Sequence, residues 1–213
     1  MELYKMAVLL INGSPHEKGC TYTALHEVAN QLEKNGIESR IFHIGKKPVA
    51  DCIACYACKK TGRCVLPGDP AVNEAIALLR EADGLVVGSP VYFSGPTGAI
   101  CSFLDRVFFL KSAAYAFKPA AAVVSCRRGG ASASFDRLNK YFTICRMPVV
   151  SSQYWNSVHG NTPEEVLQDK EGLQTMRTLA DNMAWLIKCL AAGRAAGINP
   201  PEFEPRIGTN FIR

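Results

Sequence analysis

The sequence offers no segment suited to crossing a membrane or directing secretion. A long stretch without charge, residues 84–104, is interrupted by Pro90, Pro96 and several glycines. Residues of this kind disfavour a continuous helix across a bilayer. The first apolar run, residues 6–11, is shorter than the hydrophobic core of a signal peptide. We therefore expect a cytoplasmic protein with no membrane-spanning segment.

A concentrated charge of one sign is also missing. The chain has 24 basic and 19 acidic residues, a formal net charge of +5, and they are scattered along its length. A nucleic-acid-binding surface needs a concentrated basic face, so we expect no nucleic-acid partner. With 213 residues, of which 48% are apolar and 20% charged, the chain has the composition of one globular domain.

Two common nucleotide-binding fingerprints are absent from residues 13–23, GSPHEKGCTYT, which follow the first apolar run. The Rossmann fingerprint needs glycine where Pro15 stands, and the Walker loop needs Gly-Lys before Ser or Thr, whereas here Lys18 precedes Gly19. The sequence also shows no convincing general base, nucleophile or catalytic triad. We therefore expect no catalytic side chain.

Short apolar runs alternate with helical patterns along the chain. Strands are predicted at residues 4–12, 38–44, 85–87, 120–125 and 148–154, and helices at 21–35, 70–82, 98–110, 132–145 and 164–190, the last with a break near Gly172. This alternation predicts right-handed βαβ units, and strands that are apolar throughout predict a parallel sheet covered on both faces. We predict one α/β domain over residues 1–192, a doubly wound three-layer sandwich with five parallel strands in the order 2-1-3-4-5. An irregular tail over residues 193–213 would follow it.

The loop after the first strand has the composition of an anion site. Ser14, Thr21 and Thr23 carry hydroxyl groups beside the predicted start of a helix, where free N–H groups and the helix dipole favour a negative charge. The loop suits one terminal phosphate rather than a pyrophosphate. The alternative is an ordinary helix cap in which Thr21 is the capping residue.

The loops after the third and fourth strands suit a flat ring. The third strand leads into residues 88–98, GSPVYFSGPTG, with two adjacent aromatics, and the fourth leads into a loop that contains Gly129 and Gly130. Prolines fix such a loop, glycines let the main chain approach a ring edge, and aromatics provide a stacking surface. The alternative is a structural turn whose aromatic side chains enter the core.

Together these loops carry a resemblance to the flavodoxin-like NADPH-dependent FMN reductases. The most specific segments are LLINGSPHEKGCTYT and ADGLVVGSPVYFSGPTGAICSFLDR. The resemblance implies a flavodoxin-like fold and FMN as cofactor, with NAD(P)H as co-substrate. It also implies a homodimer or homotetramer. Cys20 stands where many relatives carry asparagine. By resemblance, the FMN-binding residues are Ser14, Lys18, Cys20, Thr21, Thr23, Pro90, Val91, Tyr92, Phe93, Ser94, Gly129 and Gly130.

Four of the nine cysteines lie within thirteen residues, spaced C-x2-C-x2-C-x5-C. Without an export signal they are expected to be thiols or metal ligands rather than disulfides. Compact runs of this kind are typical of iron–sulfur sites, whereas structural zinc sites usually divide their ligands into two separate pairs. The run resembles the cysteine motif of the iron–sulfur flavoproteins, which implies a [4Fe–4S] cluster on Cys52, Cys55, Cys58 and Cys64. The alternative is a structured loop that holds no cluster.

Three functional hypotheses follow. The first is an FMN-dependent NAD(P)H oxidoreductase that passes electrons to a small-molecule acceptor, namely a quinone, a flavin or a nitro or azo compound, or to a protein carrier. The second is an iron–sulfur flavoprotein that exchanges electrons with a ferredoxin-like carrier. The third is a non-catalytic binding module whose cysteines hold zinc.

Overall fold

The computed structural model describes residues 6–67, 69–110, 113–205, 207–209 and 211. The strands are β1 (Ala7–Asn12), β2 (Glu38–His43), β3 (Gly84–Tyr92), β4 (Gly95–Pro96), β5 (Ala120–Cys126) and β6 (Ser157–His159). The helices are α1 (Cys20–Lys34), α2 (Ala57–Thr61), α3 (Pro70–Glu81), α4 (Gly98–Phe109), α5 (Ala131–Ile144), α6 (Pro163–Val166) and α7 (Lys170–Ala195), with a 3₁₀ turn η1 (Ala113–Tyr115).

Five parallel strands form the sheet in the order β2-β1-β3-β5-β6, and the short β4 pairs with β3 in the antiparallel sense. This is the predicted order 2-1-3-4-5. The central strands are almost fully buried because every residue of β5 and the first six of β3 face packed neighbours. The order changes direction between β1 and β3, so the loops after these strands open at one edge of the sheet.

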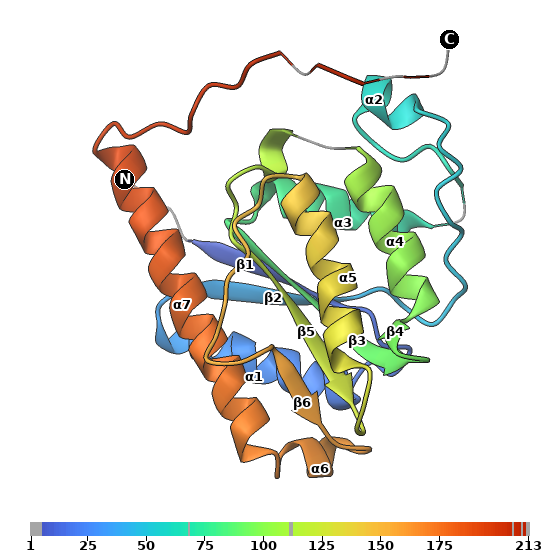
Figure 1. The fold of residues 1–213 in the computed structure, drawn as a ribbon, viewed down its shortest axis with the longest axis vertical. Helices are drawn as coiled ribbons and strands as arrows, with labels where there is room; N and C mark the ends of the chain where they lie inside the picture. The colour runs from blue at the N-terminus through green and yellow to red at the C-terminus, as the bar shows by residue number, and fades with distance from the viewer. Residues whose placement is uncertain (1–5, 68, 111–112, 206, 210, 212–213) are drawn as a thin grey trace.

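Helices cover both faces of the sheet, which makes the three layers visible in Figure 1. On one face, α3, α4 and α5 pack through residues such as Ile76, Phe103 and Phe142. On the other face, α1 and α7 pack together through residues such as Leu25 and Met183. Within the described residues, no helix is both long and apolar enough to cross a membrane.

The last strand differs from its prediction. Val149 makes only an isolated bridge to Ala120, and the strand that pairs along β5 is β6, residues 157–159, rather than 148–154. The chain leaves the sheet after Val150 and returns at Asn156, whose buried side chain donates to the carbonyl of Ala122 at 3.1 Å. The side-chain hydrogen bond of a buried asparagine therefore takes the place of the strand–strand hydrogen bonds that the apolar run suggested.

The C-terminal helical region also differs in detail. The break lies between α6 and α7, at residues 167–169, and not at Gly172. A new helix, α7, begins after Asp169 because the carboxylate of Asp169 accepts a hydrogen bond from the main-chain N–H of Gly172 at 2.9 Å and caps α7. Helix α7 runs to Ala195, slightly beyond the predicted start of the tail, and Tyr4 and Lys5 of the first predicted strand lie outside the described residues. The sequence patterns did not indicate α2 and β4.

Candidate functional site

The loops at the carboxyl ends of the strands meet along one edge, here called the rim: residues 13–19, 92–97, 127–130 and 160–162. The N–H of Gly13 donates to Gly88 at 2.9 Å, and the hydroxyl of Thr97 donates to the carbonyl of Gly13 at 3.1 Å. On the other side, the N–H of Gly160 donates to Cys126 at 3.1 Å. These bonds join the loop after β1 to β3 and its loop, and the loop after β6 to the end of β5.

An open pocket of about 570 Å³ lies at the start of α1. Lys18 and Lys46 bring two cations to it and Glu17 brings one carboxylate, and Gly19 and Cys20 bring the first turn of the 15-residue helix. Gly19 precedes the helix and has no side chain with which to cap it, so the first N–H groups can serve an anion. The pocket therefore fits the expected FMN phosphate. Three residues that follow β6 complete the lining of the pocket: Asn161, Thr162 and Pro163.

The hydroxyl groups predicted for this loop occupy different positions. Thr21 is 1% exposed, and its hydroxyl lies 2.8 Å from the hydroxyl of Ser125 at the end of β5. Ser14 is also buried, and its hydroxyl accepts from the N–H of His16 at 3.1 Å. The hydroxyl of Thr23 donates to Gly19 at 3.3 Å. In this structure all three hydroxyls therefore bond to the protein itself and shape the loop.

Cys20 and Cys126 also lie at the rim. Burial raises the pKa of both thiols above the usual 9.0, so both are protonated at neutral pH. The thiol of Cys20 lies 3.8 Å from the carbonyl of Gly160. Cys20 therefore links the start of α1 to the loop after β6.

The segment after β3 forms a tight hairpin with β4. Phe93 and Ser94 at its tip have φ angles of 50° and 59°, in the left-handed region that non-glycine residues rarely adopt. The turn exposes the whole side chain of Phe93 and about half of that of Tyr92. Pro90 and Val91 lie at the base of the hairpin and are partly buried. The aromatics thus point to solvent at the rim and do not enter the core.

The two glycines after β5 have different surroundings. Gly130 has φ +86°, and a Cβ added there would lie 2.7 Å from the Cα of Ser94 and 2.8 Å from Val91. A Cβ added at Gly129 would meet nothing within 4 Å. Gly130 therefore allows the loop to pack on the hairpin, whereas Gly129 is exposed and has open space beside it.

The four clustered cysteines lie at the other end of α4. Here we call residues 50–69 the cysteine segment. Helix α4 starts beside the rim hairpin, and at its last residue the ring of Phe109 meets that of Tyr56, with centroids 5.4 Å apart. Figure 1 shows β4 and α2 at opposite ends of this helix. Helix α4 has twelve residues and is about 18 Å long, and the cysteine segment contacts its C-terminal part at Arg106 and Phe109.

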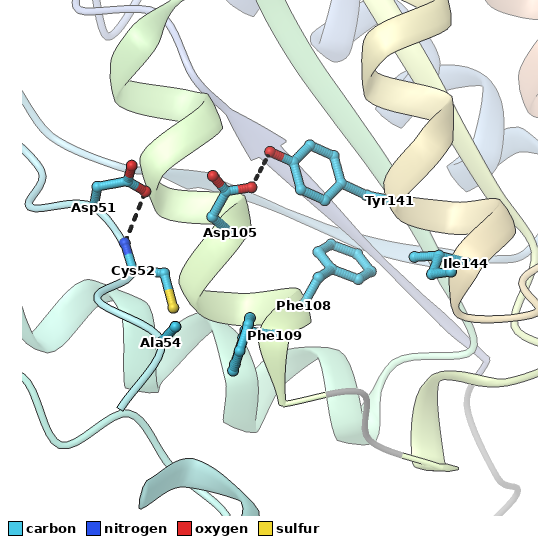
Figure 2. Close-up of a pocket in the computed structure, with 8 residues that line it drawn as sticks. All are labelled: Asp51, Cys52, Ala54, Asp105, Phe108, Phe109, Tyr141 and Ile144. Carbon is cyan, nitrogen blue, oxygen red and sulfur yellow. Dashed lines mark hydrogen bonds between the residues drawn. The ribbon is translucent and has the colours of Figure 1, made fainter. Parts of the chain in front are cut away.

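A second pocket, of about 310 Å³, lies between the cysteine segment and helices α4 and α5. Figure 2 shows Asp51 and Cys52 on one side and Asp105, Phe109 and Tyr141 on the other. The hydroxyl of Tyr141 donates to Asp105 at 2.5 Å. Burial, and then this carboxylate, raise the pKa of Tyr141, so the phenol keeps its proton.

The cysteine segment is tightly wound. Ala54, Tyr56 and Gly62 all have φ angles between 51° and 70°, and they turn the chain around the short α2. Cys58 is buried, Cys55 is exposed, and Cys52 and Cys64 are intermediate. Burial, followed by the neighbouring thiols of the other three, raises the pKa of Cys58.

The donor chemistry of these four side chains fits an iron–sulfur cluster, because four cysteines within thirteen residues supply the four thiolates that such a cluster takes. Within the described part of the chain, however, no three His, Cys, Asp or Glu side chains are already arranged to hold a metal ion. The thiols would have to close around their ligand, as happens where metal binding and local folding are coupled.

One contributor to the rim was missed from the sequence. Lys46 lies after β2 and lines the phosphate pocket beside Lys18. Nothing in its local sequence marks it, because Lys47 beside it is also an exposed lysine. Its place depends on the parallel pairing of β2 with β1, which brings the loops after both strands together.

Comparisons with known proteins agree with this architecture. The model of the NADPH-dependent FMN reductase family matches residues 6–162. An iron–sulfur flavoprotein of Methanocaldococcus jannaschii is 31% identical over an alignment of 196 positions, and the match covers 87% of this chain and 99% of the relative. One of Methanosarcina thermophila is 26% identical over 194 residues, 89% of this chain and 99% of the relative.

Among solved structures, RosB with a bound 8-demethyl-8-formylriboflavin-5'-phosphate intermediate matches with a TM-score of 0.71 at 16% identity. The match covers 96% of this chain and 92% of RosB. An archaeal flavodoxin matches with a TM-score of 0.58 at 15% identity, over 86% of this chain and 99% of the flavodoxin. At these identities the two structures show a shared flavodoxin-like fold.

Proposed function

Because the chain belongs to the NADPH-dependent FMN reductase family, and within it to the iron–sulfur flavoproteins, we propose that it takes electrons from NADH or NADPH and passes them to a small-molecule acceptor or a ferredoxin-like carrier. The chain is an FMN-containing oxidoreductase. The acceptors that we propose are a quinone, a free flavin, a nitro or azo compound, or a small iron–sulfur protein.

The phosphate pocket is the observation that carries the proposal. It combines the start of a 15-residue helix with two lysines, Lys18 and Lys46, and these groups suit a single phosphate better than a dinucleotide. The open space at Gly129 and the fixed hairpin 92–95 suit a flat ring beside it. When bound, FMN supplies the hydride chemistry.

The residues of the rim bind and orient the cofactor. Gly130 lets the β5 loop close on Val91 and Ser94, so the wall of the ring site is fixed before the ligand arrives. The buried pair Thr21 and Ser125 holds the start of α1 against the end of β5. No side chain is assigned a proton-transfer role, and the protons that a quinone, nitro or azo acceptor takes up with its electrons come from solvent.

We further propose that Cys52, Cys55, Cys58 and Cys64 hold a [4Fe–4S] cluster that exchanges single electrons with an external carrier. The C-x2-C-x2-C-x5-C spacing and the names of the relatives support this assignment. The exposed aromatics Tyr92 and Phe93 at the rim favour a contact between subunits there. We therefore propose a homodimer or homotetramer.

The test is the absorption spectrum of anaerobically purified protein, with FMN, iron, sulfide and zinc measured per chain. We expect paired flavin peaks, a broad iron–sulfur shoulder, and bleaching of the flavin by NADH or NADPH. A chain that takes up no FMN after reconstitution would overturn the oxidoreductase proposal. Stoichiometric zinc in a colourless protein would favour the binding-module hypothesis.

A further inference from the structure

Arg106 on α4 has no role in the rim, yet it is one of the most buried side chains of the protein, at 2% exposure. Its guanidinium reaches into the cysteine segment. Nε donates to the sulfur of Cys64 at 3.4 Å, and Nη1 donates to the carboxylate of Asp69 at 2.8 Å. A buried arginine needs partners of this kind because desolvation of its charge is expensive.

Two further bonds of Arg106 reach the main chain on both sides of the cysteines. Nη1 donates to the carbonyl of Ala50 at 3.3 Å, and Nη2 donates to that of Leu66 at 3.4 Å. One side chain thus holds the chain before Cys52 and the chain after Cys64.

Cys64 is fixed independently through its main chain. Its N–H donates to the side-chain oxygen of Asn73 at 2.9 Å, and the side-chain nitrogen of Asn73 donates back to its carbonyl at 2.9 Å. Asn73 therefore holds the peptide of Cys64, and Arg106 holds its sulfur. Cys55, by contrast, is exposed.

We propose that Arg106 is a positioning residue of the cluster site: it presents Cys64 as the pre-placed ligand and keeps its Nε–H bond to that sulfur when the cluster is bound. This inference rests on the proposed cluster. Hydrogen bonds to ligand sulfurs and nearby positive charge stabilise the more negative, reduced form of a cluster, and so raise its reduction potential. Arg106 therefore acts on both the retention and the potential of the cluster.

The test compares wild type with the double variant Arg106→Met/Asp69→Leu, measured anaerobically after iron–sulfur reconstitution. Exchanging both members of a buried ion pair for apolar residues leaves no unpaired charge, so we expect the fold and FMN content to persist. The cluster potential should fall by about 59 mV or more, a tenfold change in a one-electron equilibrium, and iron should be lost faster to a chelator. The single variant Arg106→Lys keeps a positive charge beside Asp69, so its cluster potential should lie between those of the double variant and wild type.

Arg80→Met is the matched control. Arg80 also holds the cysteine segment, through a bond to the carbonyl of Gly62 at 2.7 Å, but it donates to the main chain rather than to a sulfur. We expect the reduction potential of the cluster in Arg80→Met to match that of wild type. If the double variant keeps the wild-type cluster potential and iron retention, the role proposed for Arg106 is overturned, while the cluster proposal stands. A wild-type protein that assembles no cluster would overturn the cluster proposal as well as this inference, while its FMN content would still report on the rim.

Discussion

The rim and the cysteine segment lie at opposite ends of α4 and are built in opposite ways. The rim is held by main-chain bonds between neighbouring loops and by close packing at Gly130, so the protein's own contacts define its shape. The cysteine segment has one five-residue helix and several exposed side chains. Besides its short-range turns, hydrogen bonds with the side chains of Arg106, Asn73 and Arg80 hold this segment in place.

The difference suggests how each region meets its cofactor. A preformed rim loses little conformational entropy when FMN binds. A segment whose thiols are not yet gathered must order as its cluster assembles, so cluster binding and local folding are linked. Changes at one end of α4 should therefore leave the other end intact, and the following predictions test that independence.

The largest effect is expected from Cys58→Ala. Cys58 is the most buried of the four clustered cysteines, at 8% exposure, and its loss removes one of four ligands. We expect iron and sulfide to fall to background while FMN per chain stays at the wild-type value, as measured by chemical analysis and flavin absorbance. Cys189→Ala on α7, where the thiol is exposed, should change neither. Parallel loss of FMN from Cys58→Ala would show that the two ends are not independent.

The next effect is expected at the glycines of the rim. Gly130→Ala places a Cβ 2.7 Å from Ser94 in a left-handed backbone conformation, which should lower the free energy of unfolding by about 3 kcal/mol. FMN affinity should fall about tenfold, while iron content should not change. Urea unfolding and FMN titration measure the two effects.

Gly129→Ala is the matched control, because its Cβ would enter open space. We expect no packing penalty from it. Weaker FMN binding at unchanged stability would identify Gly129 as a ring contact. Equal destabilisation by both variants would contradict the close packing assigned to Gly130.

A smaller effect is expected from the buried hydroxyl pair at the start of α1. Ser125→Ala leaves the hydroxyl of Thr21 without its partner at 2.8 Å, which should cost about 1–2 kcal/mol of stability. Thr21→Val removes the same bond, and also any bond from Thr21 to the phosphate. If Thr21 binds FMN, its valine variant should retain less flavin than Ser125→Ala at similar stability. Full flavin occupancy in Thr21→Val would refute the assignment of Thr21.

The smallest effect is expected from Lys46→Ala. Lys46 is exposed at the mouth of the phosphate pocket, where its attraction for an anion is screened by water and salt. FMN affinity should fall about two- to fivefold at low ionic strength, with less difference in high salt. Lys47→Ala next to it is the control and should bind FMN as wild type does. Equal effects of the two variants would point to general charge rather than a phosphate contact.

The sequence predicted the sheet order and the bounds of α1, α3, α4 and α5 to within one or two residues, because these elements bury apolar residues in regular patterns. It failed at β6, where the buried side chain of Asn156 takes over the bonding expected from a strand. The α6–α7 break depends on Asp169, whose capping role is not visible from apolar periodicity.

The candidate site was predictable only where it lies on consecutive residues. The loop after β1, the hairpin and the cysteine spacing are all local patterns. Lys46 and Arg106 act on segments distant in the chain, and their roles exist only after folding. For Arg106 a signal was present: together with Asp105 it interrupts the apolar residues of α4, between Leu104 and Val107, and it is buried with Asp69.

Hydrogen–deuterium exchange with and without FMN tests the central claim, that the cofactor occupies the rim, most directly. The account predicts that FMN slows exchange most in peptides covering residues 13–23, 90–97 and 126–131, and more strongly there than in residues 52–64. Unchanged exchange in residues 13–23 and 126–131, with slowing confined to another part of the chain, would contradict it.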